Sequence, residues 1–379
     1  DKNKRYEQIV IKNPNFGIRN LLPYSVIDEH PRYHLRLDLS SIDLLIIHEI
    51  LRNSIKLKDI CYVNWGCRPS PSEKYVFDEF RACLKRTKNE NLCKKLIKGA
   101  DVGRYYFNWK GRWLAYLQDM YNPMFPELFE NDRICVNEVV GTEGIKASII
   151  CKGFYTDHSL SNVILYVHLP NNLLKEQRIE HNREYIGLSK KFSLKFILSI
   201  INSRIIWWFH KKWITNEMNI YPEHVKNIPI KLPTKQQPFV ILYDYMFLLN
   251  TTEERRTKEK ELIEFIDKQI IDSLVYELYF KEKFAKDGLY QEPKEYLFEA
   301  VSKHLKPINY ERWNELYWKK QLENKLTHEE EKELNNLEEE NLKTVKEVVE
   351  KIRNDKKISE LIEKIKSHPW VKIIENKLS

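Results

Sequence analysis

The chain has 379 residues, of which 31% are charged, and a formal net charge of +8. A chain of this length can bury a core and suggests about two or three domains. It holds no apolar run near the roughly 18 residues that a transmembrane helix needs, and no signal peptide opens it, so we expect no membrane partner. Asp1 is not an initiator methionine, so we expect a fragment or a processed chain.

The six cysteines all lie in the first 151 residues. No two of them form a Cys-x-x-Cys pair, and no histidine cluster completes a zinc pattern. We therefore expect reduced thiols, a cytoplasmic protein and no structural zinc.

Charge is divided unevenly along the chain. Residues 1–235 carry 37 Lys and Arg against 25 Asp and Glu, whereas residues 236–379 carry 26 against 30. A basic part joined to a mildly acidic part indicates that the first part faces a polyanion such as nucleic acid. A basic surface that is merely solvated is the alternative.

The first 50 residues are expected to be a connector. Tyr6 to Lys12 alternates like a strand, and a helix is predicted from a cap at Ser40 or Ser41. Between them, Asn13-Pro14-Asn15-Phe16 resembles the amino-methyltransferase motif Asn-Pro-Pro-aromatic, whose aromatic ring stacks on a flipped base. Asn15 replaces the second proline and no glycine-rich cofactor loop precedes it, so a plain turn is the favoured interpretation.

The stretch from Leu96 to Tyr116 reads LIKGADVGRYYFNWKGRWLAY. It predicts a loop at Gly99 to Gly103, an aromatic strand from Tyr105, a turn at Lys110-Gly111 and a returning strand to Leu117. Cations interleaved with aromatics suit a surface that reads a polyanion. A half-buried hairpin with a solvated charged face is the alternative.

Arg104 is the sharpest single prediction in this stretch. An arginine on a glycine-flanked turn projects freely, and its planar fork suits guanine or phosphate. The alternative is an ion pair with Asp101, three residues back, that holds the turn closed.

Beyond this stretch, strands are predicted over Arg133–Val140, Ala147–Lys152 and Val163–Leu169, with a loop over Gly153–His158. The basic segment Lys74–Lys98 predicts a surface helix pair that lies near phosphates or is simply solvated. Helical spacing predicts one helix over Lys195–Trp213, whose three tryptophans form either core or a stacking platform. The proline-bounded strand from Ile228 to Pro233 marks a domain boundary.

From Phe239 onward the pattern is helical. Leu334, Leu337, Asn341, Val345, Val348 and Ile352 follow the spacing of an antiparallel pair or coiled coil, with Asn341 as a register-setting polar position. This apolar seam needs a partner, which is another helix of this part, a second copy of the chain or a catalytic domain.

Several of these segments resemble, in order and spacing, the TaqI-like C-terminal specificity domain, the target-recognition domain of type IIG and type I restriction–modification proteins. The matching landmarks are Leu57–Ile60 leading to Gly66, Ile97–Val102 leading to Arg104-Tyr105, Ile201–Ser203, Ile228–Ile230, and Ile270–Tyr279. They cover about residues 40 to 285, and the tail beyond Tyr290 matches nothing in the family.

The resemblance implies a mixed α+β chain: an α/β target-recognition domain at 51–235 followed by a helical spacer or docking region at 236–379. It implies that the chain recognises a sequence in double-stranded DNA and directs adenine methylation or cleavage by a catalytic domain or subunit outside it. It also implies no cofactor in this chain, with S-adenosylmethionine and Mg²⁺ belonging to the catalytic domains. The alternatives are a helical scaffold with a basic surface, which could self-associate through its helices, and an intact methyltransferase.

No catalytic or metal-binding residue is predicted. The predicted DNA contacts are Arg68, Lys98, Arg104, Lys110, Arg112, Lys152, Tyr155, His158, Lys211 and Lys212.

Overall fold

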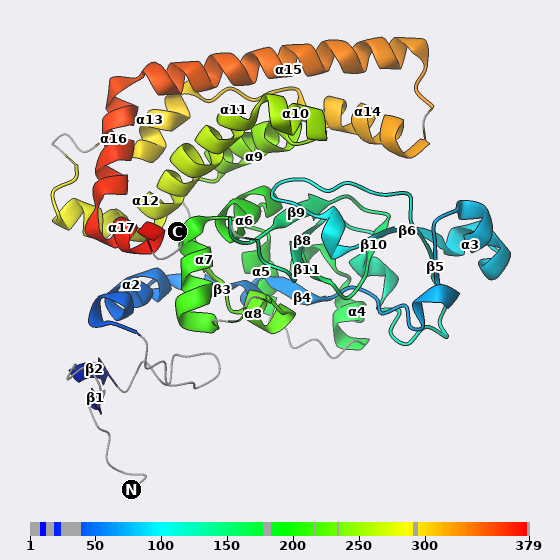
Figure 1. Ribbon diagram of the computed structural model, residues 1–379, viewed down its shortest axis with the longest axis horizontal. Coiled ribbons are helices and arrows are strands. Elements are labelled where there is room, and N and C mark those ends of the chain that lie inside the picture. The colour runs from blue at the N-terminus through cyan, green and yellow to red at the C-terminus, as the bar shows by residue number, and fades with distance from the viewer. Residues whose placement is uncertain are drawn as a thin grey trace, which may run out of the picture.

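The computed structural model describes residues 8–12, 19–23, 39–141, 143–176, 183–215, 217, 219–232, 235–290, 295–323 and 325–376. The described chain is a mixed α+β protein, as the sequence predicted, in which a part that carries the sheets lies below a part made of helices (Figure 1). Asn13 to Phe16, the segment that resembles a methyltransferase motif, lies outside the described residues.

Two four-stranded sheets form the first part. One sheet has the order β10 (Phe154–Thr156), β6 (Cys93–Ile97), β7 (Trp113–Ala115) and β5 (Val76–Phe77), with β10 and β6 parallel. The other is antiparallel, in the order β4 (Cys61–Trp65), β11 (Leu160–Leu165), β8 (Arg133–Asn137) and β9 (Ala147–Ile150). Two short antiparallel pairs are β1 (Gln8–Lys12) with β2 (Arg19–Pro23), and β3 (Ser54–Lys56) with β12 (Pro229–Lys231).

The strand predictions are confirmed for β8, β9 and β11 with shifted ends, and for β1 over Gln8–Lys12, the part of its predicted range that the structure describes. The loop predicted over Gly153–His158 is wrong, because this segment contains β10, whose Phe154 and Tyr155 are buried. The aromatic strand predicted from Tyr105 is also wrong. Tyr105 has a φ of 66°, which is the left-handed region and cannot continue a strand, so the returning strand is only the short β7.

The helices of this part are α2 (Ser41–Leu51), α3 (Phe80–Thr87), α4 (Asn171–Glu176), α5 (Arg183–Ser189), α6 (Leu194–Ile201), α7 (Arg204–Phe209) and α8 (Pro222–Lys226). α2 starts as predicted: the Ser40 side chain accepts the Asp43 N–H, and the Asp43 carboxylate accepts the Ser40 N–H. The basic segment Lys74–Lys98 holds one α-helix, α3, flanked by β5 and β6, so the predicted helix pair is wrong.

The helix predicted over Lys195–Trp213 is interrupted at Asn202 and Ser203, so α6 and α7 are separate. α7 leads into a π-helical turn, η7 (His210–Ile214). The tryptophans of this segment are core residues and not a stacking platform, because Trp207, Trp208 and Trp213 are all buried.

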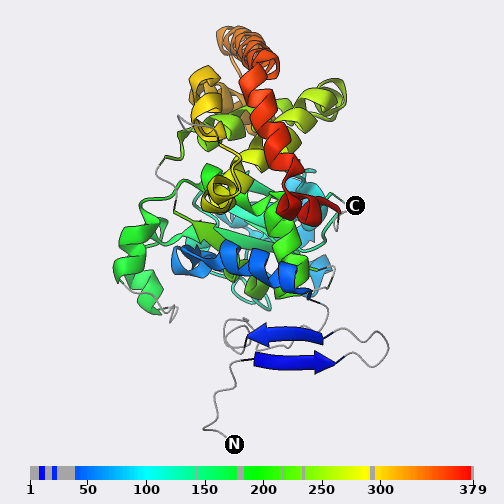
Figure 2. The same cartoon turned by 90° about the vertical axis from the view of Figure 1, so that its left-hand side faces the viewer.

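The helical part consists of α9 (Gln237–Leu249), α10 (Glu253–Lys258), α11 (Lys260–Glu264), the π-helical turn η8 (Phe265–Ile271), α12 (Asp272–Lys286), α13 (Leu297–His304), α14 (Tyr310–Glu323), α15 (His328–Asn354), α16 (Lys356–Ser367) and α17 (Pro369–Asn376). Figures 1 and 2 show α16 running back from α15 toward the sheets, where α17 contacts α7. One apolar core joins the two parts, from Leu39 to Ile374.

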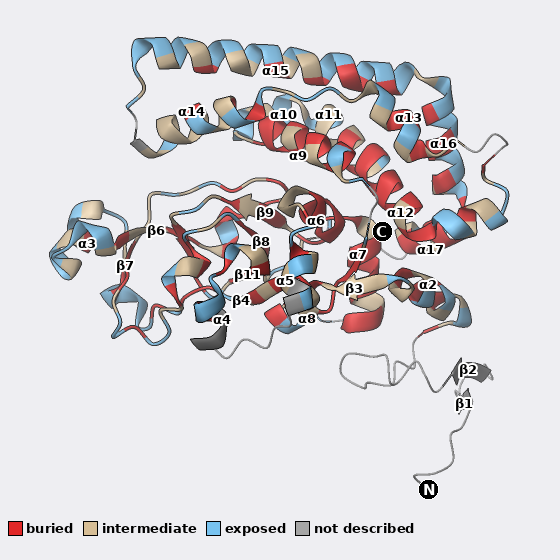
Figure 3. Ribbon diagram, turned by 180° about the vertical axis from the view of Figure 1, so that it is seen from behind, coloured by how far each residue is buried: buried red, intermediate tan, exposed pale blue. Residues whose placement is uncertain are grey.

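The predicted seam on α15 packs on helices of the same chain, the first of the three partners considered. Leu334, Val345, Val348 and Ile352 are buried on the inner face of α15, and its outer face is exposed (Figure 3). Asn341 is buried and bonds the backbone of Asn309, accepting its N–H at 3.0 Å and donating to its carbonyl at 3.4 Å. The seam therefore gives no support to self-association, and Asn341 joins two segments of one chain.

Candidate nucleic-acid interface

The two sheets share one edge at which several loops leave the strands. β4, β6, β8 and β10 end there, and β7, β9 and β11 start there. The pairings that show this are Trp65 with Ser161, Asn137 with Leu160, Val136 with Ala147, Ile97 with Thr156, and Lys95 with Trp113. We call the segments 65–68, 98–112, 138–141, 143–146 and 157–159 the loop edge. Tyr121 and Asn122 belong to it, because the Arg68 N–H donates to the Asn122 carbonyl at 2.7 Å.

Gly66 brings the two sheets together at this edge. Its N–H donates to Leu160 of the second sheet at 3.2 Å, and the N–H of Cys67 donates to Thr156 of the first at 2.8 Å. A Cβ at position 66 would lie 2.2 Å from the Thr156 carbonyl oxygen, so the two backbones approach more closely than any other residue type allows.

Large apolar side chains are exposed on the loop edge. Of the five most exposed ones in the described part of the chain, three lie here: Trp65 is 42% exposed, Tyr121 72% and Val139 62%. Planar rings can stack on bases and an apolar tip can meet a thymine methyl group, and exposed apolar groups that gather on one face mark a binding surface. None of these three residues is among the contacts predicted from the sequence. The Tyr121-Asn122-Pro123 turn signal was available for Tyr121.

Four of the predicted contacts are accessible on the loop edge. Arg68 and His158 are exposed, with the Arg68 guanidinium carbon 5.0 Å from the centre of the Tyr121 ring. Lys110 is exposed on the long loop 98–112, and Lys98 is half-buried at its start. None of the four side chains forms an ion pair with another described residue.

Lys152 lies elsewhere, in the turn between β9 and β10 at the opposite edge of the sheets. Lys211 and Lys212 are half-buried on η7, where the Lys211 ammonium lies 4.9 Å from the centre of the Trp207 ring. The Trp207 ring in turn packs beside Gly144 of the loop edge, so Lys211 borders this surface.

Tyr155 and Arg112 are engaged inside the protein. Tyr155 is wrong as a base contact because β10 turns its ring into the core, stacked on Phe129 at 4.3 Å between centroids. Arg112 forms an ion pair with the buried Asp101, whose carboxylate also accepts the N–H of Lys98 at 2.8 Å.

Arg104 is also engaged internally, so its predicted DNA contact is wrong, and so is the alternative pair with Asp101. Its guanidinium donates to both carboxylate oxygens of Asp267, at 2.8 and 2.6 Å, and to the carbonyl of Asn202 at 2.6 Å. Burial lowers the pKa of Arg104, and the Asp267 carboxylate more than offsets this, so the pKa lies above its usual value. Arg104 therefore joins the loop edge to η8 of the helical part.

The three aromatic residues after Arg104 also contact the helical part. The Tyr105 hydroxyl donates to Asp267 at 3.1 Å, the Tyr106 ring lies 3.9 Å from the Arg256 guanidinium carbon of α10, and Phe107 stacks on Trp318 of α14 with centroids 4.7 Å apart. We call residues 104–107 the anchor tip, and 98–103 and 108–112 its flanks. Residues 104–107, whose composition suggested a surface that reads nucleic acid, thus attach this loop to the helical part.

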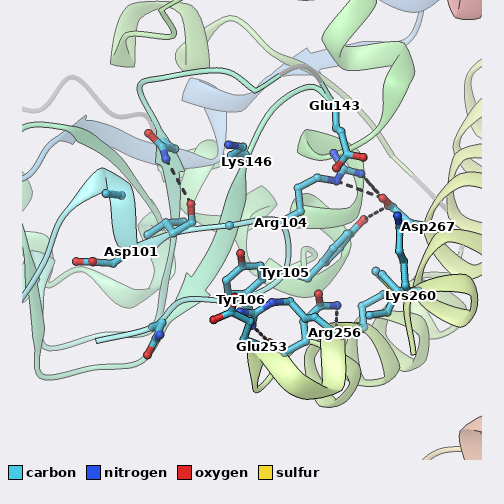
Figure 4. Close-up of a pocket in the computed structure, with 18 of the residues that line it drawn as sticks. Asp101, Arg104, Tyr105, Tyr106, Glu143, Lys146, Glu253, Arg256, Lys260 and Asp267 are labelled. Carbon is cyan, nitrogen blue, oxygen red and sulfur yellow. Dashed lines mark hydrogen bonds and ion pairs between the residues drawn. The ribbon is translucent and has the colours of Figure 1, made fainter. Parts of the chain in front are cut away.

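A cleft of about 670 Å³ lies between the loop edge and the helical part (Figure 4). Lys110 and Lys146 line it from the loops, and Arg256 and Lys260 from the helices. Carboxylates line the same cleft, including those of Glu143 and Glu253. The cleft is therefore of mixed charge and is not by itself a polyanion site.

At the start of η7, His210 is buried and its pKa is lowered to about 3, first by burial and then by His224 and Lys211. Neither ring nitrogen has a hydrogen-bond partner among the described residues. An unfolded histidine titrates near pH 6.5, so between pH 6.5 and 3 the unfolded state binds one more proton than the folded state.

We expect His210 to destabilise the fold as pH falls, by up to about 1.4 kcal/mol per pH unit within this window. Chemical denaturation at pH 7 and pH 5 of the wild type, His210→Phe and the exposed control His158→Phe measures this. His210→Phe should reduce the pH dependence and His158→Phe should leave it unchanged. Equal pH dependence in all three proteins contradicts the prediction.

The described residues hold no group of three or more His, Cys, Asp or Glu side chains that could bind a metal ion. None of the described helices is both long enough and apolar enough to span a bilayer.

No protein-family model matches this chain, and no curated protein sequence matches it. Among solved structures, the arrangement is distantly similar to that of MmeI, a type IIL restriction–modification enzyme, in complex with DNA. The identity is 10% and the TM-score 0.38, over 73% of this chain and 39% of the MmeI chain. The matched part of this chain thus spans well under half of the MmeI chain.

Proposed function

We propose that this chain recognises a sequence in duplex DNA with its loop edge, as part of a restriction–modification system. The observation that carries the proposal is the convergence of exposed aromatic and cationic side chains from separate loops on one edge. Trp65, Arg68, Tyr121 and His158 are exposed there, with Arg68 over Tyr121.

Cations that form no ion pair with another described residue, such as Arg68 and Lys110, gain most from phosphate, because binding releases counterions from DNA. Rigid side chains at strand ends can enter a groove and meet base edges or methyl groups, and sequence is read there. Loops that leave a common sheet edge supply both groups on a fixed support.

In this proposal the chain performs no chemistry itself. Adenine methylation or cleavage, with S-adenosylmethionine and Mg²⁺, belongs to a catalytic domain or subunit that the loop edge directs to its site. The helical part joins the recognition loops to that partner. The resemblance of the landmark segments to target-recognition domains supports this division of labour.

The test is a selection of duplexes from a randomised pool by the full chain, followed by affinity measurements over a range of salt concentrations. A common sequence should be enriched, and log Kd should rise steeply with log salt. An unenriched pool, or an affinity that does not change with salt, contradicts the proposal.

We expect Arg68→Ala to weaken binding and to reduce the salt slope by about one unit if Arg68 contacts phosphate, or to relax preference at one base pair if it contacts a base. Tyr121→Ala should weaken binding through lost contact with a base or sugar. Lys152→Ala, which removes an exposed cation at the opposite edge, is the matched control and should bind as the wild type does. Wild-type affinity and preference in both Arg68→Ala and Tyr121→Ala would remove this part of the loop edge from the interface.

A further inference from the structure

The loop 98–112 serves two surfaces at once. Its flanks carry Lys98 and Lys110 on the loop edge, whereas its anchor tip contacts three elements of the helical part. The Arg104 contact joins residues 163 positions apart in the chain. Any movement of η8, α10 or α14 relative to the sheets therefore acts directly on this loop.

The anchor tip is tightly constrained. The Gly103 N–H donates to the Tyr106 carbonyl at 2.9 Å, and the Tyr105 N–H donates to Ala147 of β9 at 3.0 Å. Tyr105 has a φ of 66°, a conformation that persists where surrounding contacts impose it. The Tyr105 hydroxyl and the Arg104 guanidinium share one carboxylate, Asp267, so this side chain holds both residues in place.

We propose that the helical part positions the flanks of this loop for DNA, with Asp267, Arg256 and Trp318 as the positioning residues. The inference rests on the proposed function and deepens it, because it assigns part of the sequence preference to residues that touch no DNA. A preorganised loop loses less conformational entropy on binding than a mobile one, so loosening its anchor should weaken the preferred complex. Linkage also requires that bound DNA stabilise the contact between the two parts.

The test compares the wild-type full chain with Asp267→Asn, which keeps the side-chain shape and removes the charge that holds Arg104. The probes are the duplex that the wild type enriches and a scrambled duplex of equal composition. Asp267→Asn should bind the enriched duplex about three- to tenfold more weakly and discriminate less between the two duplexes. The control is Asp287→Asn, which alters a carboxylate of the helical part paired with Lys283 and His368, away from the loop.

A second readout separates positioning from stability. Hydrogen exchange of the amides at 98–112 should be faster in folded Asp267→Asn, and DNA should slow it in the wild type. If Asp267→Asn does not fold, Trp318→Leu is the second variant, because it removes the ring that stacks on Phe107 of the same loop. It should give the same loss of affinity and discrimination and the same faster exchange. A folded variant with a lowered melting temperature but unchanged affinity and discrimination overturns the inference alone. Failure of the wild type to bind any duplex overturns the proposed function and the inference together.

Discussion

Replacing Arg104 with alanine should lower the free energy of unfolding by about 3–5 kcal/mol, the usual cost of removing one partner of a buried ion pair. The Arg104 and Asp267 side chains are 15% and 10% exposed, so Asp267 would be left charged with little access to water. The carbonyls of Asn202 and Ile145 would lose their arginine donors as well. Urea denaturation followed by circular dichroism measures the effect.

The double variant Arg104→Ala/Asp267→Asn should recover part of this loss, because it leaves no uncompensated carboxylate. Arg86→Ala is the matched control: Arg86 pairs with Asp119 in a more exposed setting, at 40% and 62%, and such pairs contribute about 0–1 kcal/mol. A loss at Arg104 no larger than at Arg86 contradicts the anchor described above.

Gly66→Ala should destabilise the sheet part by about 1–3 kcal/mol or more, the range found when a group is forced into filled space. The added Cβ would meet the backbone of Thr156 and Asp157 at 2.2 and 2.5 Å, and backbone atoms cannot move aside as a flexible side chain can. Relief requires the two sheets to separate at the loop edge, so DNA binding should be lost as well. Thermal unfolding and affinity for the enriched duplex measure the two effects.

Gly187→Ala is the control for this substitution. Gly187 lies in α5, where an added Cβ meets no described atom within 4 Å, and alanine has the higher helix propensity. We expect this variant to be at least as stable as the wild type. Similar behaviour of the two variants would show that the close approach at Gly66 is not restrictive.

Local sequence patterns determined a large part of the fold. A serine cap at Ser40 or Ser41 placed the start of α2, and short strand-like runs, two of them separated by the turn glycines Gly141 and Gly144, placed β8, β9 and β11. These signals depend on neighbours along the chain. The spacing from Leu334 to Ile352 identified the buried face of α15 for the same reason. The change from a basic to an acidic part coincides with the change from sheets to helices.

The roles of individual side chains were decided by tertiary structure. Arg104 and the aromatics after it have the composition of a nucleic-acid surface, but Asp267, Arg256 and Trp318 meet them from helices far along the chain. Trp65 and Val139, by contrast, carry no local sign of exposure, and Tyr121 carries only the turn signal of the Asn122-Pro123 pair that follows it. The composition and spacing of a segment indicate which kinds of group its side chains are able to contact. The groups that they do contact depend on which distant segments the fold brings beside them. That is why the class of fold was accessible from the sequence and the division of one loop into anchor and flanks was not.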